Sequence, residues 1–217
     1  MKNFYLDIKS DKVHNPQYGK LHNFKVPFMM GLIGPTSCGK SNTLMNIIHS
    51  MKGTFQKIVF CVMNFDNDPL YRTFYDKMIK KYPEAIEYYE EANVPDIEEM
   101  EECPTLFIFD DLQNENAANQ EVAKYYKYGR KKGFSCIYLG QTFIDIPIFI
   151  RRQFQYLIIK KVNEMDDLKR ILNKYLKKDY MNRFEDIYKY CTSDFLHCMT
   201  IDFNKGKIYR NFIELIE

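Results

Sequence analysis

The sequence predicts an α/β fold, a three-layer sandwich around a mainly parallel sheet. Short apolar runs alternate along the chain with segments whose apolar residues recur at helical spacing, which is typical of strands connected by helices. The runs are almost continuously apolar, as expected for parallel strands that helices cover on both faces. A glycine-rich loop joins the first run to the first helical segment. A chain of 217 residues has room for one domain with a full hydrophobic core.

The elements follow from their own stretches of sequence. Strands are expected over residues 28–33, 57–63, 105–109, 134–139 and 156–159, and helices over 41–51, 70–81, 116–132, 166–176 and 179–191. The acidic stretch around Pro83 and Pro95 indicates helix fragments and loop. Residues 195–203 and 207–212 flank an Asn-Lys-Gly turn at 204–206, which predicts a hairpin.

The domain organisation is expected to be simple. Residues 1–26 are too mixed to assign and form an N-terminal extension, and residues 27–217 form one domain. Within that domain we expect a core at 27–161 and a C-terminal part of helices and hairpin at 162–217.

The composition is that of a globular protein, with 46% hydrophobic and 28% charged residues, which excludes disordered and fibrous classes. A net charge of +2 does not indicate nucleic-acid binding through a global field, so any DNA contact must come from local clusters. Residues 84–102 hold nine carboxylates and no Lys or Arg, whereas residues 160–189 lean basic. The contrast predicts two different surfaces, and two solvated helix faces of opposite sign would give the same pattern.

The six cysteines form no Cys-x-x-Cys pair, and His197 lacks the further ligands that a zinc site needs. They are expected to be reduced thiols. The first 12 residues contain no apolar stretch of the kind that a signal peptide needs, and no segment reaches membrane-spanning length. We therefore expect the protein to work inside a cell, without secretion or stable membrane insertion.

The pattern Gly-x-x-x-x-Gly-Lys-Ser at residues 34–41 is a P-loop, because it follows an apolar strand and opens a helix. Its glycines let backbone N–H groups wrap phosphates, and the helix N-terminus adds its positive dipole. Lys40 is expected to reach the β- and γ-phosphates of ATP, and the Ser41 hydroxyl to ligate Mg²⁺. Cys38 is expected only to fill space. The residues expected to bind ATP are Gly34, Pro35, Thr36, Ser37, Cys38, Gly39, Lys40, Ser41 and Thr43.

Polar side chains that follow two later strands complete the predicted site. Asp110 and Asp111 come directly after an apolar strand. Enzymes with a P-loop place a carboxylate beside Mg²⁺ at this position. Asp110 is therefore the expected metal-side residue, and Asp111 the expected group that orients or deprotonates the attacking water. A helix N-cap is the alternative for Asp111. Gln141 follows the fourth strand, where its amide would contact the γ-phosphate and the water; a turn-stabilising amide is the alternative.

Four sequence blocks together carry a family resemblance: residues 34–41, 106–112, 129–141 and 145–154. In this order and separation they resemble the poxvirus-type genome-packaging ATPases of the FtsK/HerA superfamily, which occur in large DNA viruses and their virophage relatives. The resemblance runs from about residue 28 to 161. Many cellular members carry Glu at the position of Asp111. An Asp at this position is also seen in the viral branch.

The resemblance implies a motor that uses ATP hydrolysis to translocate double-stranded DNA into a capsid. It implies a sheet whose fourth strand lies between the first and third. It also implies a homo-oligomeric ring, a hexamer or pentamer, that binds nucleotide at subunit interfaces and meets capsid or portal components. The expected location is the host-cell cytoplasm or virus factory, with association with the virion as a further expectation.

Basic residues supply the remaining candidates. A ring ATPase needs a positive charge from the neighbouring subunit at the γ-phosphate, and Arg130 is the candidate because it lies just before the fourth strand, where related motors are thought to place this residue. Arg151 and Arg152 are its competitors, and a surface salt bridge is the alternative for each. The lysines 124, 127, 131 and 132 would line one helix face and contact DNA phosphates, or form a solvated basic face.

Two other functions fit parts of the sequence. A small nucleoside or nucleotide kinase shares the size, loop and fold, but the Asp pair, Gln141 and the absence of an evident Arg-rich lid oppose it. A non-hydrolysing assembly protein would use the loop for binding alone. Phosphate release from ATP, with and without DNA or nucleoside monophosphates, separates the three.

Overall fold

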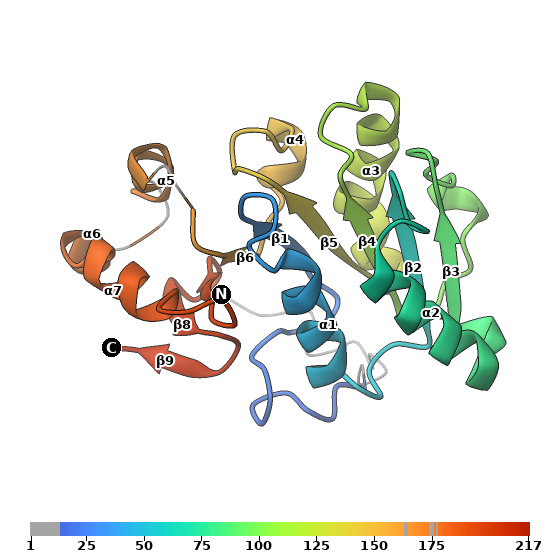
Figure 1. Cartoon of the computed structure of the whole chain (residues 1–217), viewed down its shortest axis with the longest axis horizontal. Coiled ribbons are helices and arrows are strands. Elements are labelled where there is room, and N and C mark those ends of the chain that lie inside the picture. The colour runs from blue at the N-terminus through green and yellow to red at the C-terminus, as the bar shows by residue number, and fades with distance from the viewer. Residues whose placement is uncertain (1–13, 163–164, 174–175, 177) are drawn as a thin grey trace, which may run out of the picture.

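The computed structural model describes residues 14–162, 165–173, 176 and 178–217. Within these residues a nine-stranded sheet forms the centre of the molecule, in the order β3-β2-β4-β5-β1-β6-β7-β8-β9 (Figure 1). The strands are β1 (Met29–Ile33), β2 (Lys57–Val62), β3 (Ile86–Tyr89), β4 (Thr105–Asp110), β5 (Phe134–Gly140), β6 (Tyr156–Ile159), β7 (Met199–Asp202), β8 (Lys207–Arg210) and β9 (Glu214–Ile216). The sheet is parallel from β3 to β6 and antiparallel from β6 to β9. The predicted α/β fold with a mainly parallel sheet is confirmed.

The expected first, third and fourth strands are β1, β4 and β5. β5 lies between β4 and β1, which confirms the strand order that the resemblance implies. Its register brings three strand ends together, because Ile33 of β1 pairs with Gly140 of β5, and Asp110 of β4 pairs with Leu139. The P-loop, the Asp pair and Gln141 therefore all lie at the carboxyl ends of the parallel strands.

Helices cover both faces of the sheet. Those in the described chain are α1 (Lys40–Ser50), α2 (Pro69–Lys81), α3 (Asn116–Tyr128), α4 (Ile148–Arg151), α5 (Met165–Leu172), α6 (Lys178–Asn182) and α7 (Phe184–Cys191), with short 3-10 helices at Pro83–Ala85, Ile97–Glu99 and Gly129–Lys132. α1 and α2 pack on one face, and α3, α4, α5 and α7 pack on the other. None of the helices in the described part of the chain has the length and apolar character of a membrane span.

The apolar runs of the strands are explained by these two helical layers. In β4, Phe107 and Phe109 pack into the core under α3, whereas Leu106 and Ile108 pack into the core under α1 and α2. Successive strand residues point to opposite faces, so a strand covered on both sides needs apolar residues at every position. All four of these side chains are fully buried.

Several predicted boundaries are wrong. The stretch expected to be helix fragments and loop contains the edge strand β3, which pairs with β2 alone. The helix expected over 116–132 ends at Tyr128 and continues as a 3-10 helix. The helix expected over 179–191 is divided between α6 and α7, and α4 and β9 were not expected.

The C-terminal hairpin is confirmed as β7 and β8, although residues 195–198 precede β7 as a separate loop. Residues 14–26 pack onto this part of the molecule: Phe24 is buried, and the Asn23 N–H donates to Phe212 O at 3.0 Å. The expected domain boundary at residue 26 stays a prediction.

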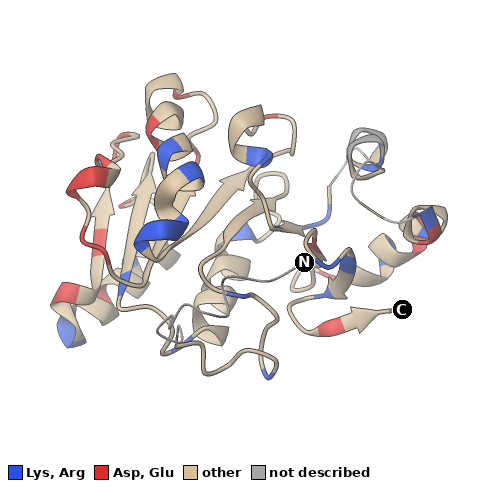
Figure 2. Ribbon diagram, turned by 180° about the vertical axis from the view of Figure 1, so that it is seen from behind, with Lys and Arg blue, Asp and Glu red and all other residues tan. Residues whose placement is uncertain are grey.

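In the ribbon seen from behind, Lys and Arg occur on many elements, and Asp and Glu are frequent around β3 (Figure 2). The acidic run lies against two of the lysines proposed to contact DNA: Lys124 is 3.7 Å from Asp96, and Lys132 is 3.0 Å from Glu98. These carboxylates lower the positive charge that Lys124 and Lys132 can offer to DNA.

Candidate active site

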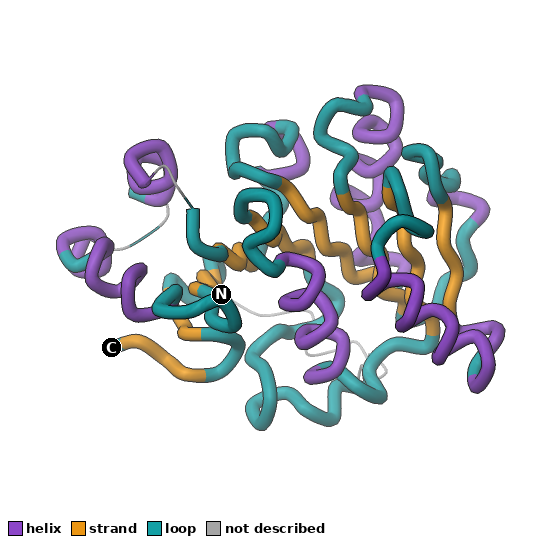
Figure 3. The backbone as a smooth tube through the Cα atoms, in the orientation of Figure 1, coloured by secondary structure: helices purple, strands orange, loops and turns teal. Residues whose placement is uncertain are grey.

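The loops that follow β1, β2, β4 and β5 gather at the carboxyl edge of the sheet, as Figure 3 shows. A cavity of about 400 Å³ lies between them. Eight of the residues predicted from sequence line it: Thr36, Ser37, Gly39, Lys40, Ser41, Asp110, Asp111 and Gln141. Segments far apart in the sequence thus meet at one site, as the strand order requires.

The P-loop backbone adopts a conformation that suits anion binding. Ser37 and Gly39 have φ angles of 62° and 88°, in the left-handed region that favours glycine. Successive left-handed and right-handed residues turn backbone N–H groups toward a common concavity. Gly34 has a different reason to be glycine, since a Cβ there would lie 2.5 Å from Cys38 Sγ and 2.7 Å from Lys160 Cβ.

Lys40 stands at the first position of α1 and lines the cavity. Its Nζ donates to Gly34 O at 2.7 Å and to Pro35 O at 3.1 Å. These backbone carbonyls hold the ammonium within the loop. No carboxylate in the described residues pairs with Lys40, so the charge faces the cavity without an internal counter-ion.

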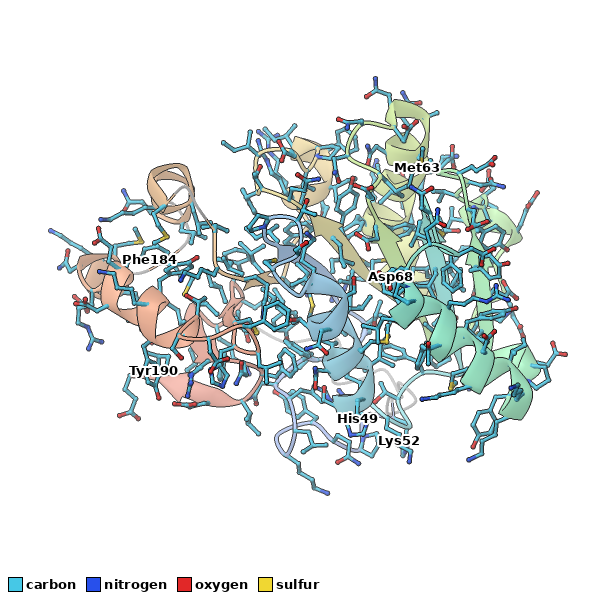
Figure 4. All side chains as sticks on the ribbon, viewed as in Figure 1. His49, Lys52, Met63, Asp68, Phe184 and Tyr190 are labelled. Atoms are coloured by element: carbon cyan, nitrogen blue, oxygen red, sulfur yellow. The ribbon has the colours of Figure 1, made fainter. Side chains whose placement is uncertain are left out.

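A hydrogen-bonded chain links the P-loop to β4 through α2. The Ser41 hydroxyl donates to Asp68 Oδ2 at 3.1 Å, and Asp68 caps α2 by accepting from the backbone N–H groups of Leu70 and Tyr71. The Tyr71 hydroxyl in turn donates to Asp110 Oδ2 at 2.6 Å. Asp68, labelled in Figure 4, lies at the start of α2 and faces the same cavity.

Burial raises the pKa of Asp110 to about 6, although the Tyr71 hydroxyl and the Lys40 ammonium lower it. Asp111 and Asp68 add to the increase because their negative charges disfavour a third one nearby. A carboxyl group with a raised folded-state pKa opposes folding at neutral pH, where it is ionised. Such a cost is typical of a residue retained for function.

The groups around Ser41 fit a magnesium ion in their chemistry. Mg²⁺ prefers oxygen ligands and is usually held by one or two carboxylates together with substrate phosphates and water. Ser41, Asp68 and Asp110 offer one hydroxyl and two carboxylates within one hydrogen-bonded chain. No group of three His, Cys, Asp or Glu side chains suited to a metal occurs among the described residues, and a site shared with phosphates does not need one.

Asp111 has a φ angle of 59°, which turns its backbone away from β4. Its Oδ1 accepts from Gln113 Nε2 at 2.9 Å, and both residues line the cavity. The alternative interpretation as a helix N-cap is wrong, because the N-cap of α3 is Glu115. Asp111 is exposed in the cavity and held by a neighbouring amide.

Gln141 follows β5, is exposed, and lines the cavity. Its side-chain amide makes no hydrogen bond within the described chain, so it does not stabilise the turn, as the alternative interpretation requires. The amide is free to donate to and accept from a ligand. Its role toward the γ-phosphate stays a prediction.

Four residues of the predicted ATP-binding set do not line the cavity: Gly34, Pro35, Cys38 and Thr43. Gly34 and Pro35 act through the carbonyls that hold Lys40. Thr43 is buried in α1 with its hydroxyl lacking a hydrogen-bond partner. Burial raises the pKa of the Cys38 thiol, which opposes a thiolate role and agrees with a space-filling one. ATP contacts by Cys38 and Thr43 stay predictions.

The candidate arginines lie away from this cavity. Arg130 is exposed in the 3-10 helix that precedes the amino end of β5, whereas Gln141 follows the carboxyl end of that strand. It pairs with no carboxylate in the described residues. Arg151 donates to Phe143 O at 3.0 Å and to Ile144 O at 3.2 Å, so it stabilises the turn after β5, whereas Arg152 is exposed. The choice of Arg130 as an arginine finger stays a prediction.

Nine residues that line the cavity were not predicted as site residues, and the sequence signals of three of them differ: Asp68, Tyr71 and Phe195. Asp68 falls in a polar turn before an expected helix, and the following Pro69 is the signal of an N-cap that could have identified it. In the sequence, Tyr71 cannot be distinguished from an ordinary core residue, because the contact of its hydroxyl group depends on the fold. Phe195 comes from the C-terminal part and reaches the P-loop only through the folding of β6 and β7.

Comparisons with known proteins agree with this geometry. A family model described as the poxvirus A32 protein matches residues 17–194, while the comparison with curated proteins gives no match. The genome packaging NTPase B204 of Sulfolobus turreted icosahedral virus 2, in complex with ATPγS, has a TM-score of 0.60 at 16% identity over 87% of this chain and 99% of that one. B204, the DNA-packaging ATPase of Sulfolobus turreted icosahedral virus, has a TM-score of 0.58 at 15% identity over 92% and 99%. EssC (ATPases 2 and 3) from Geobacillus thermodenitrificans has a TM-score of 0.50 at 16% identity over 67% and 34%. Sequence identities this low show that these structures share the fold of this chain.

Proposed function

Since the chain belongs to the poxvirus A32 protein family, we propose that it is an ATP-hydrolysing motor that translocates double-stranded viral DNA into the capsid during genome packaging. The observation that carries the proposal is the single cavity in which Lys40 and Ser41 face Asp110, Asp111 and Gln141. A loop that only bound nucleotide would not need the carboxylates and amide beside it. The shared fold with a viral genome packaging NTPase supports the same function.

Phosphate binding begins with the P-loop backbone and the N-terminus of α1, whose N–H groups and dipole attract anions. Lys40 then exchanges the carbonyls of Gly34 and Pro35, 2.7 and 3.1 Å from its Nζ, for the β- and γ-phosphate oxygens. This exchange places the ammonium where negative charge increases during phosphoryl transfer.

Hydrolysis uses the exposed carboxylate of Asp111. A water oxygen attacks the γ-phosphorus, the bond to the β–γ bridging oxygen breaks, and Asp111 orients the water and accepts its proton. The Gln113 amide, 2.9 Å from Asp111 Oδ1, fixes the direction of that carboxylate. The free amide of Gln141 contacts the γ-phosphate and the water, and so distinguishes ATP from ADP.

Mg²⁺ would be held by Ser41 and Asp110, with Asp68 as a third oxygen group, and would offset the charge of the phosphates. Asp68 already accepts from the Ser41 hydroxyl at 3.1 Å. Tyr71 keeps the Asp110 carboxylate oriented through its 2.6 Å bond.

The partners follow from the motor function. The protein acts as a homo-oligomeric ring, a hexamer or pentamer, on double-stranded DNA and meets capsid or portal components, in the host-cell cytoplasm or virus factory. Arg130 reaches the γ-phosphate of the neighbouring subunit, which is consistent with its exposure and its distance from the chain's own cavity. Lys127 and Lys131 remain the better candidates for DNA phosphates, because Lys124 and Lys132 pair with carboxylates.

Phosphate release from ATP with Mg²⁺ tests the proposal, measured with and without double-stranded DNA. We expect hydrolysis that DNA stimulates, and stimulation that decreases steeply between about 50 and 200 mM salt, because counterion release dominates such binding. Lys40→Ala should abolish turnover, whereas Lys52→Ala, which removes an exposed lysine after α1, should not. Phosphate transfer to a nucleoside monophosphate would indicate a kinase, and no phosphate release from the wild type would indicate a binding protein.

A further inference from the structure

One aromatic side chain that lines the cavity has no role in the proposed mechanism. Phe195 lines the cavity from the loop between α7 and β7, and this large aromatic side chain remains 57% exposed. Tyr71 is the other aromatic residue that lines the cavity, but it is buried and its hydroxyl donates to Asp110. Phe195 is therefore the aromatic surface in the cavity that is open to a ligand.

The ring lies directly against the P-loop. A Cβ atom at Gly39 would lie 2.7 Å from Phe195 Cζ, so a side chain at Gly39 would collide with it. The phosphate-binding backbone and the phenyl ring are thus adjacent walls of one cavity. The ring is therefore a neighbour of any nucleotide whose phosphates lie on the loop.

A buried lysine holds the ring in place. Lys160 is 1% exposed, and its Nζ donates to Phe195 O at 2.5 Å and to His197 O at 2.9 Å. The ammonium also lies 5.6 Å from the centroid of the Phe195 ring, within the range of a cation–π contact. Lys160 follows β6, and its backbone N–H donates to Ile33 O at 2.9 Å, so it ties the loop of Phe195 to the strand that precedes the P-loop.

The loop has a second set of restraints. Asp194 accepts from the Leu196 N–H at 2.8 Å and lies 2.7 Å from His197 Nδ1. These bonds fix the backbone on both sides of Phe195 while the ring stays outside the core. An exposed aromatic ring on a restrained loop, facing a polar phosphate-binding cavity, is suited to stack on a flat ligand.

We propose that Phe195 is the stacking surface for the nucleobase of ATP, and that Lys160 is the positioning residue that holds it against the P-loop. The proposal rests on the proposed function, because it requires that the cavity bind a nucleotide. Stacking tolerates any base, since every base has a π face. The ring should therefore increase affinity for ATP and GTP alike and contribute nothing to binding of a phosphate chain without a base.

The chain contains no tryptophan, so Phe195→Trp introduces a single indole at the proposed stacking surface. Its fluorescence should change on titration with ATP or GTP and remain constant with inorganic tripolyphosphate. Leu196→Trp is the matched control, since Leu196 is the neighbouring residue, is 67% exposed and does not line the cavity. Its fluorescence should not respond to either ligand. A constant signal from Phe195→Trp under saturating ATP would overturn the proposal.

Affinities measured by calorimetry with Mg²⁺ present give the second test. Phe195→Ala should weaken ATP binding by about 5- to 150-fold, the equivalent of ~1–3 kcal/mol for one stacked base, and leave tripolyphosphate binding unchanged. Equal losses for both ligands would contradict base stacking. Failure of the wild type to bind ATP would instead contradict the proposed function.

Lys160 is tested in combination with Phe195. Lys160→Met alone should weaken ATP binding in the same direction as Phe195→Ala and leave tripolyphosphate binding unchanged. In the Phe195→Ala background it should cause no further loss, because its effect passes through the ring. An additive loss, or a loss for tripolyphosphate, would show that Lys160 acts on the P-loop itself. The Phe195 variants decide the main proposal even where Lys160→Met does not fold.

Discussion

Tyr71→Phe tests the buried hydrogen bond that supports the candidate metal-side carboxylate. The substitution removes one hydroxyl, 2.6 Å from Asp110 Oδ2, and keeps the ring that packs 5.1 Å from the Phe60 centroid. A hydrogen bond to a charged acceptor contributes about 1.5–3 kcal/mol, and one to a neutral acceptor about 0.5–1.5 kcal/mol. The cost of the substitution should therefore depend on whether Asp110 is ionised.

The sign follows from the pKa of Asp110, which burial raises to about 6. At pH 8 the carboxylate is charged, and at pH 5 it is mostly protonated. Burial also raises the pKa of Tyr71 well above its ordinary value, so the hydroxyl remains a donor at pH 8. Tyr71→Phe should lower the free energy of unfolding by about 1.5–3 kcal/mol at pH 8 and by about 0.5–1.5 kcal/mol at pH 5.

Urea unfolding at the two pH values, without nucleotide and with a metal chelator, measures both costs. Tyr125→Phe is the control, because its buried hydroxyl donates to Pro95 O at 2.9 Å and a backbone carbonyl does not titrate. Its cost should be the same at pH 5 and pH 8. A cost for Tyr71→Phe that is equal at the two values, or greater at pH 5, would refute the reasoning.

Three further predictions concern the water-orienting carboxylate, the neighbouring subunit and acid stability. Asp111→Asn keeps the size of the side chain but removes its basicity, so ATP should still bind while phosphate release falls by roughly 10²–10⁴-fold; normal turnover would exclude Asp111 as the base. Arg130→Ala subunits mixed with Lys40→Ala subunits, each inactive alone, should regain ATPase activity in mixed rings, because an arginine finger acts in trans and contributes ~10³–10⁵ to kcat; no recovery would move the assignment to another arginine. Burial lowers the pKa of His22 to about 4, and its Nδ1 accepts from the Phe24 N–H at 3.1 Å, so the unfolded chain binds the additional proton and the folded state loses up to about 3 kcal/mol as pH falls from about 6.5 to 4. Thermal unfolding should show this loss relative to His22→Asn, which keeps an acceptor and does not titrate; an equal loss in His22→Asn would contradict the assignment to His22.

The fold could be predicted where a strand is buried on both faces. β4 is apolar at consecutive positions because two helical layers cover it, and that pattern is visible without a structure. β3 could not be predicted in the same way. It is an edge strand with Glu87 between Ile86 and Tyr88, and an edge strand with a charged residue has the composition of a loop.

The site could be predicted where its chemistry is local in sequence. The P-loop and the Asp pair each occupy a few consecutive residues, and both line the cavity. Pro69 marks Asp68 as a helix N-cap, but the cavity contacts of Asp68 and Phe195 could not be predicted, because each arises only when the sheet forms. Ser41 and Asp68 are 27 positions apart, and Phe195 lies beside Gly39 only after β6 and β7 pair.

Movement along duplex DNA is the central claim, and displacement of a third DNA strand measures it most directly. A duplex carrying a fluorescent triplex-forming strand, far from the end where the protein loads, loses that strand only when a motor arrives. We expect displacement by the wild type with ATP and Mg²⁺, and none by Lys40→Ala or with a non-hydrolysable ATP analogue. ATP hydrolysis by the wild type without displacement, or displacement without hydrolysis, would contradict a DNA-translocating motor.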